Sequence, residues 1–409
     1  MRAKQVLIGL FLSSLLASCG KPSLISYEKR AEAASHLDPK IVKAQNAFGL
    51  TLHRHLVQEG NDTNVFLSPT SLSTALAMTY NGSAGNTRQA MAITLGWEEM
   101  PLEELNKGYK TMNHLLKQTG RGVELNTANS LWSRKGIRLA NPFAQTARND
   151  YEAGVEELDF SSKTAHETVN KWVKKQTKGK IPAILNKPLE PSDSLVLVNA
   201  IYFNGSWEDE FSPSSTKVEA FRLSDGSTKK VSMMSRTGTY EYAEEDGYQA
   251  IRLPYGEGQM DMLVILPDEN SSLPALHERL WSDASRWQKP FKERNGEIQL
   301  PSFKLEYEKS MDKALQSMGM AVAYDPARAD FPLIAPGFNH VISHVMHKTY
   351  LEVNEKGTEA AAVTSVTVKA TSAEIPLDPF SMNVDRPFFI AIEDRQTGAW
   401  LFIGSIYSP

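Results

Sequence analysis

The sequence contains a single cysteine, Cys19, among 409 residues. One cysteine cannot form a disulfide within the chain, and it cannot supply a zinc site built on several thiolates. The nine histidines are scattered without the paired spacing of a zinc protease, and no glycine-rich nucleotide-binding loop follows an expected strand. No serine lies in the sequence context of a nucleophile elbow. We therefore expect no metal, no cofactor and no enzymatic activity.

The chain also lacks an excess of charge of either sign. Its 44 Lys and Arg residues nearly balance 48 Asp and Glu residues, which gives a formal net charge of -4. The sequence has no basic patch and no acidic tail, so we expect no nucleic-acid partner. Beyond the N-terminus no apolar run is long enough to cross a bilayer, which excludes a membrane-spanning body.

The N-terminus has the three parts of a bacterial lipoprotein signal. Arg2 and Lys4 precede an apolar run over residues 6–16, which leads into the sequence Leu16-Ala17-Ser18-Cys19. Small residues before the cut fit the signal peptidase, and the Cys19 thiol can accept a diacylglycerol. An ordinary signal peptide with an incidental cysteine is the alternative.

This interpretation divides the chain into a signal peptide over residues 1–18, a lipidated Cys19 with a polar tether over residues 19–37, and a folded body over residues 38–409. Gly20 stands where many lipoproteins retained at the inner membrane carry Asp, which favours the outer membrane. We expect a protein of the bacterial cell envelope that is attached to the membrane through a lipid.

Helical spacing of apolar residues dominates the first part of the body. It predicts helices over residues 41–57, 69–81 and 165–178, the second with Pro69 in its first turn. Later apolar or alternating runs predict strands over residues 195–203, 260–266, 298–307, 341–353, 387–393 and 400–407. Since the chain lacks a regular strand and helix alternation, an internal repeat and a domain linker, we expect one α+β domain with an antiparallel or mixed sheet.

The segment Glu355–Ser372 has the composition of a strand without a partner. It contains no proline, it begins near the flexible Gly357, and the alternate residues from Thr358 to Ala370 carry no charge. Small residues come first and β-branched residues follow, which suits a segment that wedges between strands and then pairs with them. A plain surface strand or a solvated linker is the alternative.

Glu355–Ala362 resembles the hinge of the reactive-centre loop of inhibitory serpins almost residue for residue. Other stretches resemble serpin motifs and follow the order of the family, at residues 64–71, 81–87, 128–132, 197–203 with Trp207, and 386–389 with Gly404. These independent motifs cover nearly all of the body, and by this resemblance the chain is identified as a member of the serpin family.

The resemblance implies a single-domain serpin fold of about nine helices and three β-sheets, with an exposed reactive-centre loop over about residues 355–376. It also implies three groups of site residues. The hinge consists of Glu355, Gly357, Thr358, Glu359, Ala360, Ala361 and Ala362; the polar "shutter", under the point where the central sheet opens, consists of Ser68, Ser71, Asn199 and His347; and Trp207 lies in the "breach", where insertion begins. The alternatives are a buried core histidine for His347 and a core tryptophan for Trp207.

The resemblance further implies a suicide inhibitor. A protease that cleaves the loop stays attached as an acyl-enzyme and is trapped when the loop inserts into the central sheet. Trypsin-like and elastase-like serine proteases are the expected partners of a monomeric inhibitor, and cysteine proteases are a second class. A non-inhibitory serpin that acts as a carrier or chaperone is one alternative function. A structural surface lipoprotein with an Ala- and Thr-rich loop is the other.

The scissile bond has more than one candidate. Lys369 is the only basic residue between the hinge and Pro376, so the bond Lys369-Ala370 suits a trypsin-like pocket. The usual register of the family places the bond at Thr371-Ser372 instead, and Val368 suits an elastase-like pocket.

One position departs from the family pattern. Many serpins carry a lysine that pairs with the glutamate corresponding to Glu355, and this chain has Ser302 there. Lys304 is near in sequence but is expected elsewhere on the strand. The partner of Glu355 therefore stays open at this point.

Overall fold

The computed structural model describes residues 26–60, 62–282, 287, 289–338, 340–358 and 379–409. Its helices are α1 (Tyr27–Ser35), α2 (Pro39–Glu59), α3 (Pro69–Tyr80), α4 (Gly85–Leu95), α5 (Leu102–Leu116), α6 (Asn141–Asn149), α7 (Ala165–Gln176), α8 (Leu273–Ser282), α9 (Asp312–Leu315) and α10 (Ala321–Tyr324). In this described part of the chain, no helix is both long and apolar enough to span a membrane.

The strands are β1 (Val65–Leu67), β2 (Val123–Arg134), β3 (Gly154–Leu158), β4 (Leu195–Ser206), β5 (Lys217–Arg222), β6 (Thr228–Glu245), β7 (Tyr248–Tyr255), β8 (Met260–Pro267), β9 (Lys292–Pro301), β10 (Phe303–Ser310), β11 (Ile342–Asn354), β12 (Gly357–Thr358), β13 (Phe380–Asn383), β14 (Phe388–Asp394) and β15 (Ala399–Ile406). The three predicted helices correspond to α2, α3 and α7. The predicted run 298–307 is two strands, because the chain passes from one sheet to the other at Ser302.

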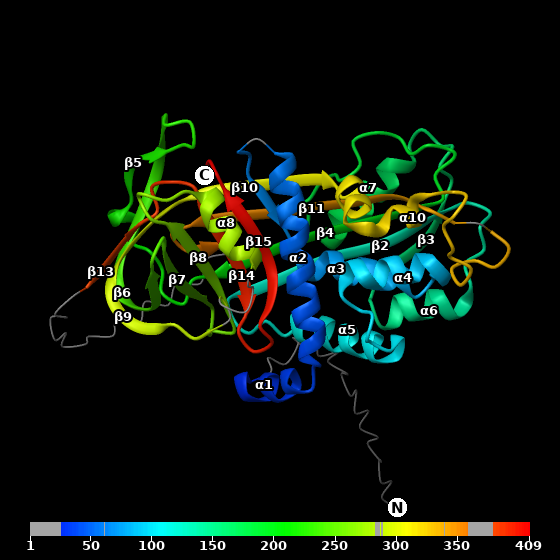
Figure 1. The fold of residues 1–409 in the computed structure, drawn as a ribbon, viewed down its shortest axis with the longest axis horizontal. Coiled ribbons are helices and arrows are strands. Elements are labelled where there is room, and N and C mark those ends of the chain that lie inside the picture. Colours follow the sequence, from blue (N-terminus) through cyan, green and yellow to red (C-terminus); the bar gives the residue numbers. More distant parts are fainter. Residues whose placement is uncertain (1–25, 61, 283–286, 288, 339, 359–378) are drawn as a thin grey trace, which may run out of the picture.

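The strands form two hydrogen-bonded sheets (Figure 1). The six-stranded sheet has the order β10-β11-β12-β4-β2-β3, and the nine-stranded sheet has the order β1-β15-β14-β8-β7-β6-β9-β13 with β5 paired to β6. This arrangement confirms the predicted α+β fold. The expected three sheets connect as two among the described residues because β6 pairs with β9 over 233–242 and with β7 over 241–245.

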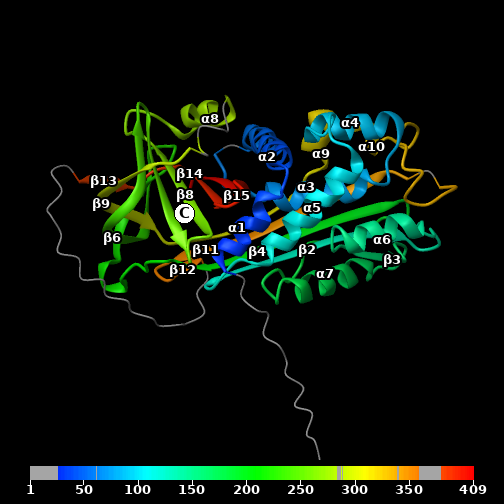
Figure 2. The ribbon, with the colours of Figure 1, turned by 90° about the horizontal axis from the view of Figure 1, so that it is seen from below.

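Helices cover both faces of the six-stranded sheet (Figure 2). Along β4, Val196 and Val198 pack in one apolar cluster with α7, whereas Leu195 and Leu197 pack in another with α3. A strand that is buried on both faces has no polar side, which accounts for its continuous apolar run. Asn199 is the polar exception in this run, and it lies in the candidate site described below.

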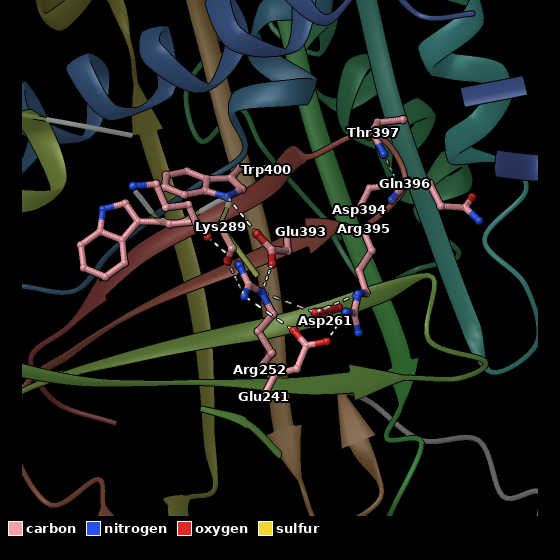
Figure 3. Close-up of polar contacts among 11 residues, drawn as sticks. Glu241, Arg252, Asp261, Lys289, Glu393, Asp394, Arg395, Gln396, Thr397 and Trp400 are labelled. Carbon is pink, nitrogen blue, oxygen red and sulfur yellow. Dashed lines mark hydrogen bonds and ion pairs between the residues drawn. The ribbon is translucent and has the colours of Figure 1, made fainter. Parts of the chain in front are cut away.

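A buried ionic cluster ties β7 to its neighbours in the nine-stranded sheet (Figure 3). Arg252 on β7 donates from Nε to Glu393 on β14 at 2.5 Å. Asp261 on β8 lies 3.7 Å from the same nitrogen and 3.5 Å from Nε of Arg395. Burial, with Glu393 nearby, raises the pKa of Asp261 well above its usual value. These contacts fix the strand that ends at Tyr255.

The segment expected to be a tether is helical over its second half, so the prediction for residues 19–37 needs correction. α1 is capped by Ser26, and Arg30 on this helix is fully buried. Arg30 forms an ion pair with Asp394 and donates to the carbonyl oxygen of Leu115 at 3.2 Å and to Gln396 at 2.6 Å. The folded body therefore begins before residue 38, and residues 19–25 lie outside the described part.

Candidate functional site

The two central strands of the six-stranded sheet pair directly along most of their length. β4 and β11 are parallel neighbours from the pair Leu195 and Ile342 to the pair Tyr202 and Tyr350. Beyond this point β12 lies between them, antiparallel to both, with Thr358 opposite Val353 on one side and Gly205 on the other. Two residues of the predicted hinge, Gly357 and Thr358, are therefore already part of the sheet.

Gly357 is required at the point where the chain enters the sheet. Its φ is +141°, a conformation that residues with a side chain rarely adopt. A Cβ atom at this position would overlap the carbonyl oxygen of Gly205 on β4. The backbone can thus approach β4 closely only because residue 357 has no side chain.

Trp207 contacts the turn that leads from β11 into β12. Its indole nitrogen donates to the carbonyl oxygen of Asn354 at 2.9 Å, and its backbone amide donates to that of Lys356 at 2.9 Å. The indole is almost fully buried and stacks on Tyr255 at 4.4 Å between ring centroids. The structure therefore places the predicted breach residue in contact with the turn that leads into the loop.

Glu355 has a neutral partner in this structure. The Thr216 hydroxyl donates to its Oε1 at 2.8 Å, and the backbone amide of Phe211 donates to its carbonyl oxygen at 2.8 Å. Lys304 forms an ion pair with Glu306 at 3.3 Å and lies over the Tyr350 ring. Thr216 thus bonds the carboxylate that a lysine holds in many serpins, and Lys304 is engaged elsewhere.

The four predicted shutter residues lie together where β4 and β11 meet. Asn199 donates to Ser71 and accepts from His347 Nδ1 at 2.5 Å. The proton is assigned to Nδ1 because the second ring nitrogen, Nε2, accepts a hydrogen bond. The backbone amide of Ser68 donates this hydrogen bond to His347 Nε2 at 3.0 Å. Ser68 caps α3 by accepting from the Ser71 amide at 3.2 Å. All four side chains are buried.

His347 is held neutral in this cluster. Burial lowers its pKa to about 3, since removal from water penalises the charged ring. A neutral ring can accept from Ser68 and donate to Asn199 at the same time, as the two observed contacts require. The ring therefore joins β11 to both β4 and the start of α3.

Several predicted site residues lie outside the described part of the chain. They are the hinge residues Glu359, Ala360, Ala361 and Ala362, the candidates for the scissile bond Val368, Lys369, Ala370, Thr371 and Ser372, and the proposed lipidation site Cys19. Among the described residues, no group of three or more His, Cys, Asp or Glu side chains is arranged to hold a metal ion.

The structure adds three residues that the sequence did not single out. Asn129 on β2 accepts from Asn199 and so extends the polar row to a third strand. Thr216 bonds Glu355, and the Tyr255 hydroxyl lies 2.7 Å from that of Thr358. Asn129 lies within the serpin-like stretch 128–132, so the sequence resemblance could have pointed to it. No sequence motif pointed to Thr216.

Comparison with known proteins identifies the family. The family model described as serpin (serine protease inhibitor) matches residues 43–409. Serpin B6 of Pongo abelii is 34% identical over 379 residues, which cover 90% of this chain and 99% of that protein. The leukocyte elastase inhibitor of Homo sapiens is 33% identical over 384 residues, covering 90% of this chain and 100% of the inhibitor.

The fold comparison agrees with the sequence comparison. The crystal structure of tengpin, a thermophilic serpin in its native state, superimposes with a TM-score of 0.83 at 33% identity and covers 91% of this chain and 95% of tengpin. The chain belongs to the serpin family.

Proposed function

We propose that this chain is an inhibitory serpin that traps serine proteases as a suicide substrate. The observation that carries the proposal is the position of β12, where the start of the loop already lies between β4 and β11 as a strand. Gly357 permits this entry, and the uncharged alternate residues from Thr358 to Ala370 suit further insertion. The name of the leukocyte elastase inhibitor among its relatives also supports an inhibitory function.

The chemistry begins as ordinary proteolysis. The protease serine oxygen attacks the carbonyl carbon of the loop residue, the C–N bond to the next residue breaks, and the new amine takes the proton that the protease histidine removed. The loop then remains attached to the protease through an ester. Insertion of about a dozen residues as a strand gains on the order of ten hydrogen bonds of ~1 kcal/mol each, comparable to the stability of a whole domain.

We assign the scissile bond to Lys369-Ala370 and the targets to trypsin-like proteases, with Thr371-Ser372 as the second bond and elastase-like proteases as the second class. The lone Lys369 supports the first assignment, because a carboxylate at the base of a trypsin-like pocket binds a single basic residue in a neutral setting. Cysteine proteases are a further class that the same loop can engage by the corresponding thioester.

We also propose that the protein is a lipoprotein monomer of the bacterial envelope, attached to the outer membrane through Cys19. The basic residues, apolar run and small residues before Cys19 support this proposal. Labelling of the expressed protein with a radioactive fatty acid tests it, with Cys19→Ser as the unlabelled control.

The function is tested by mixing the protein with trypsin and, separately, with a neutrophil-type elastase, followed by denaturing gel electrophoresis and sequencing of the released peptide. We expect a covalent band near the summed mass and a peptide that begins at Ala370. Thr358→Arg is the matched control, because a charge cannot be accommodated at this fully buried side chain, and it should be cleaved without forming the band. Cleavage of the unaltered protein without any covalent band contradicts inhibition and favours the carrier or chaperone function.

A further inference from the structure

A hydroxyl pair links the start of the loop to the other sheet. The Tyr255 hydroxyl on β7 lies 2.7 Å from that of Thr358 on β12. Both side chains are fully buried. The contact joins a strand of the nine-stranded sheet to the inserted residue of the six-stranded sheet, so it connects two elements that do not pair through their backbones.

The Tyr255 ring is fixed on two sides. Trp207 stacks on it with an interplanar angle of 11°, and Phe203 meets it edge-on at 5.0 Å between centroids. Burial raises the pKa of Tyr255 above its usual value, so the phenol keeps its proton and can donate to Thr358. The hydroxyl is thus held at one position under β12.

Loss of either partner leaves the other hydroxyl buried without its bond. Removing one hydroxyl destabilises the folded state more than removing both, because the remaining hydroxyl is buried away from water without a hydrogen-bond partner. Thr358 can regain solvent only if β12 leaves the sheet. The hydroxyl pair therefore favours the state in which the end of the sheet is already open.

We propose that Tyr255 is a positioning residue for inhibition, which holds Thr358 in the sheet before any protease cleaves the loop. The inference rests on the proposed inhibitory function. An inserted Thr358 lets the remaining loop continue from an opened end, so that insertion competes better with hydrolysis of the acyl-enzyme. In this role Tyr255 acts through Thr358.

The test is the stoichiometry of inhibition, the number of inhibitor molecules consumed per protease molecule trapped. A stoichiometry of one means that every inhibitor molecule traps a protease, and any excess over one counts the inhibitor molecules that are cleaved without trapping. For Tyr255→Phe and Thr358→Val we expect this excess to rise about five-fold, because insertion from a closed sheet is slower. Thr358→Ser keeps the hydroxyl and should behave like the unaltered protein. The double variant should be no worse than either single variant, since both partners of the pair are then absent.

Amide hydrogen exchange gives a second readout that does not depend on inhibition. Tyr255→Phe should speed exchange at the Trp207 amide, which donates to Lys356, and at Thr358. Tyr151→Phe is the matched control, because it removes a buried tyrosine hydroxyl that bonds Asn106 at 2.6 Å.

The two readouts separate the possible failures. Unchanged exchange in Tyr255→Phe overturns the proposal, and so does faster exchange with an unchanged stoichiometry. If the unaltered protein traps no protease, the proposed function fails, while faster exchange in Tyr255→Phe still supports the part of the proposal in which Tyr255 holds Thr358.

Discussion

At the scale of single residues, His347 links the polar cluster of the central sheet to pH. In the unfolded chain a histidine binds a proton near pH 6.5, whereas burial keeps His347 neutral in the folded protein down to about pH 3. Between these values only the unfolded state gains the proton, so the free energy of unfolding falls as the pH falls. The contribution of His347 is complete above pH 6.5 and is lost toward pH 3.

We therefore expect His347→Gln to reduce the slope of the unfolding free energy against pH by up to about 1.4 kcal/mol per pH unit between pH 6 and 4. At pH 7 the variant should be less stable by about 1–3 kcal/mol, because Asn199 loses a buried partner. Urea unfolding at a series of pH values measures both effects. His36→Gln, at an exposed histidine, is the control, and an identical slope in His347→Gln contradicts a neutral ring.

At the scale of elements, α1 depends on one long-range contact. Arg30 is fully buried and pairs with Asp394, which is also fully buried. Removal of one member of such a pair leaves an uncompensated charge. We expect Arg30→Ala to lower the free energy of unfolding by about 3 kcal/mol and to expose α1 to proteolysis. Lys29→Ala removes the same charge at an exposed neighbour and should change neither quantity; equal stability of the two variants would contradict the role of Arg30.

The same scale explains which elements could be predicted from the sequence. β4 and α2 follow from apolar residues at the spacing of a strand or a helix, which is a local property. α1 could not be predicted this way, because its buried arginine pairs with Asp394, 364 residues away in the chain. The local sequence of residues 26–36 is polar, and only the folded body supplies the partner.

Some residues of the candidate site could likewise be found from the sequence, and others only from the structure. The resemblance led to Trp207 and His347, which in the structure contact Asn354 and Asn199. Asn129 meets Asn199 through the register of β2 with β4, and Thr216 meets Glu355 across 139 residues. Register and long-range contact are set by pairing between distant segments, so neither could be predicted from local composition.

At the scale of the whole molecule, the six-stranded sheet is arranged to gain a strand. β4 and β11 are parallel neighbours, whereas β12 is antiparallel to both. Extension of β12 would replace one parallel pairing by two antiparallel ones, which are slightly more stable per residue. The bond between His347 and Asn199 joins the two strands that must separate, so it has to break as the loop advances. The free energy lost with this one hydrogen bond is small compared with the free energy gained from the new strand pairings.

We therefore expect the protein with a cleaved loop to be far more stable to heat than the intact protein. About ten new hydrogen bonds of ~1 kcal/mol each, at ~2 °C per kcal/mol for a large domain, correspond to a rise on the order of 20 °C in the unfolding temperature. Scanning calorimetry before and after limited proteolysis with a metalloprotease, which forms no acyl-enzyme, measures this rise. Thr358→Arg, cleaved in the same way, should show little of it, because the charged side chain blocks the buried position from which insertion continues. Equal unfolding temperatures for the intact and cleaved forms of the unaltered protein would mean that the sheet does not accept the loop.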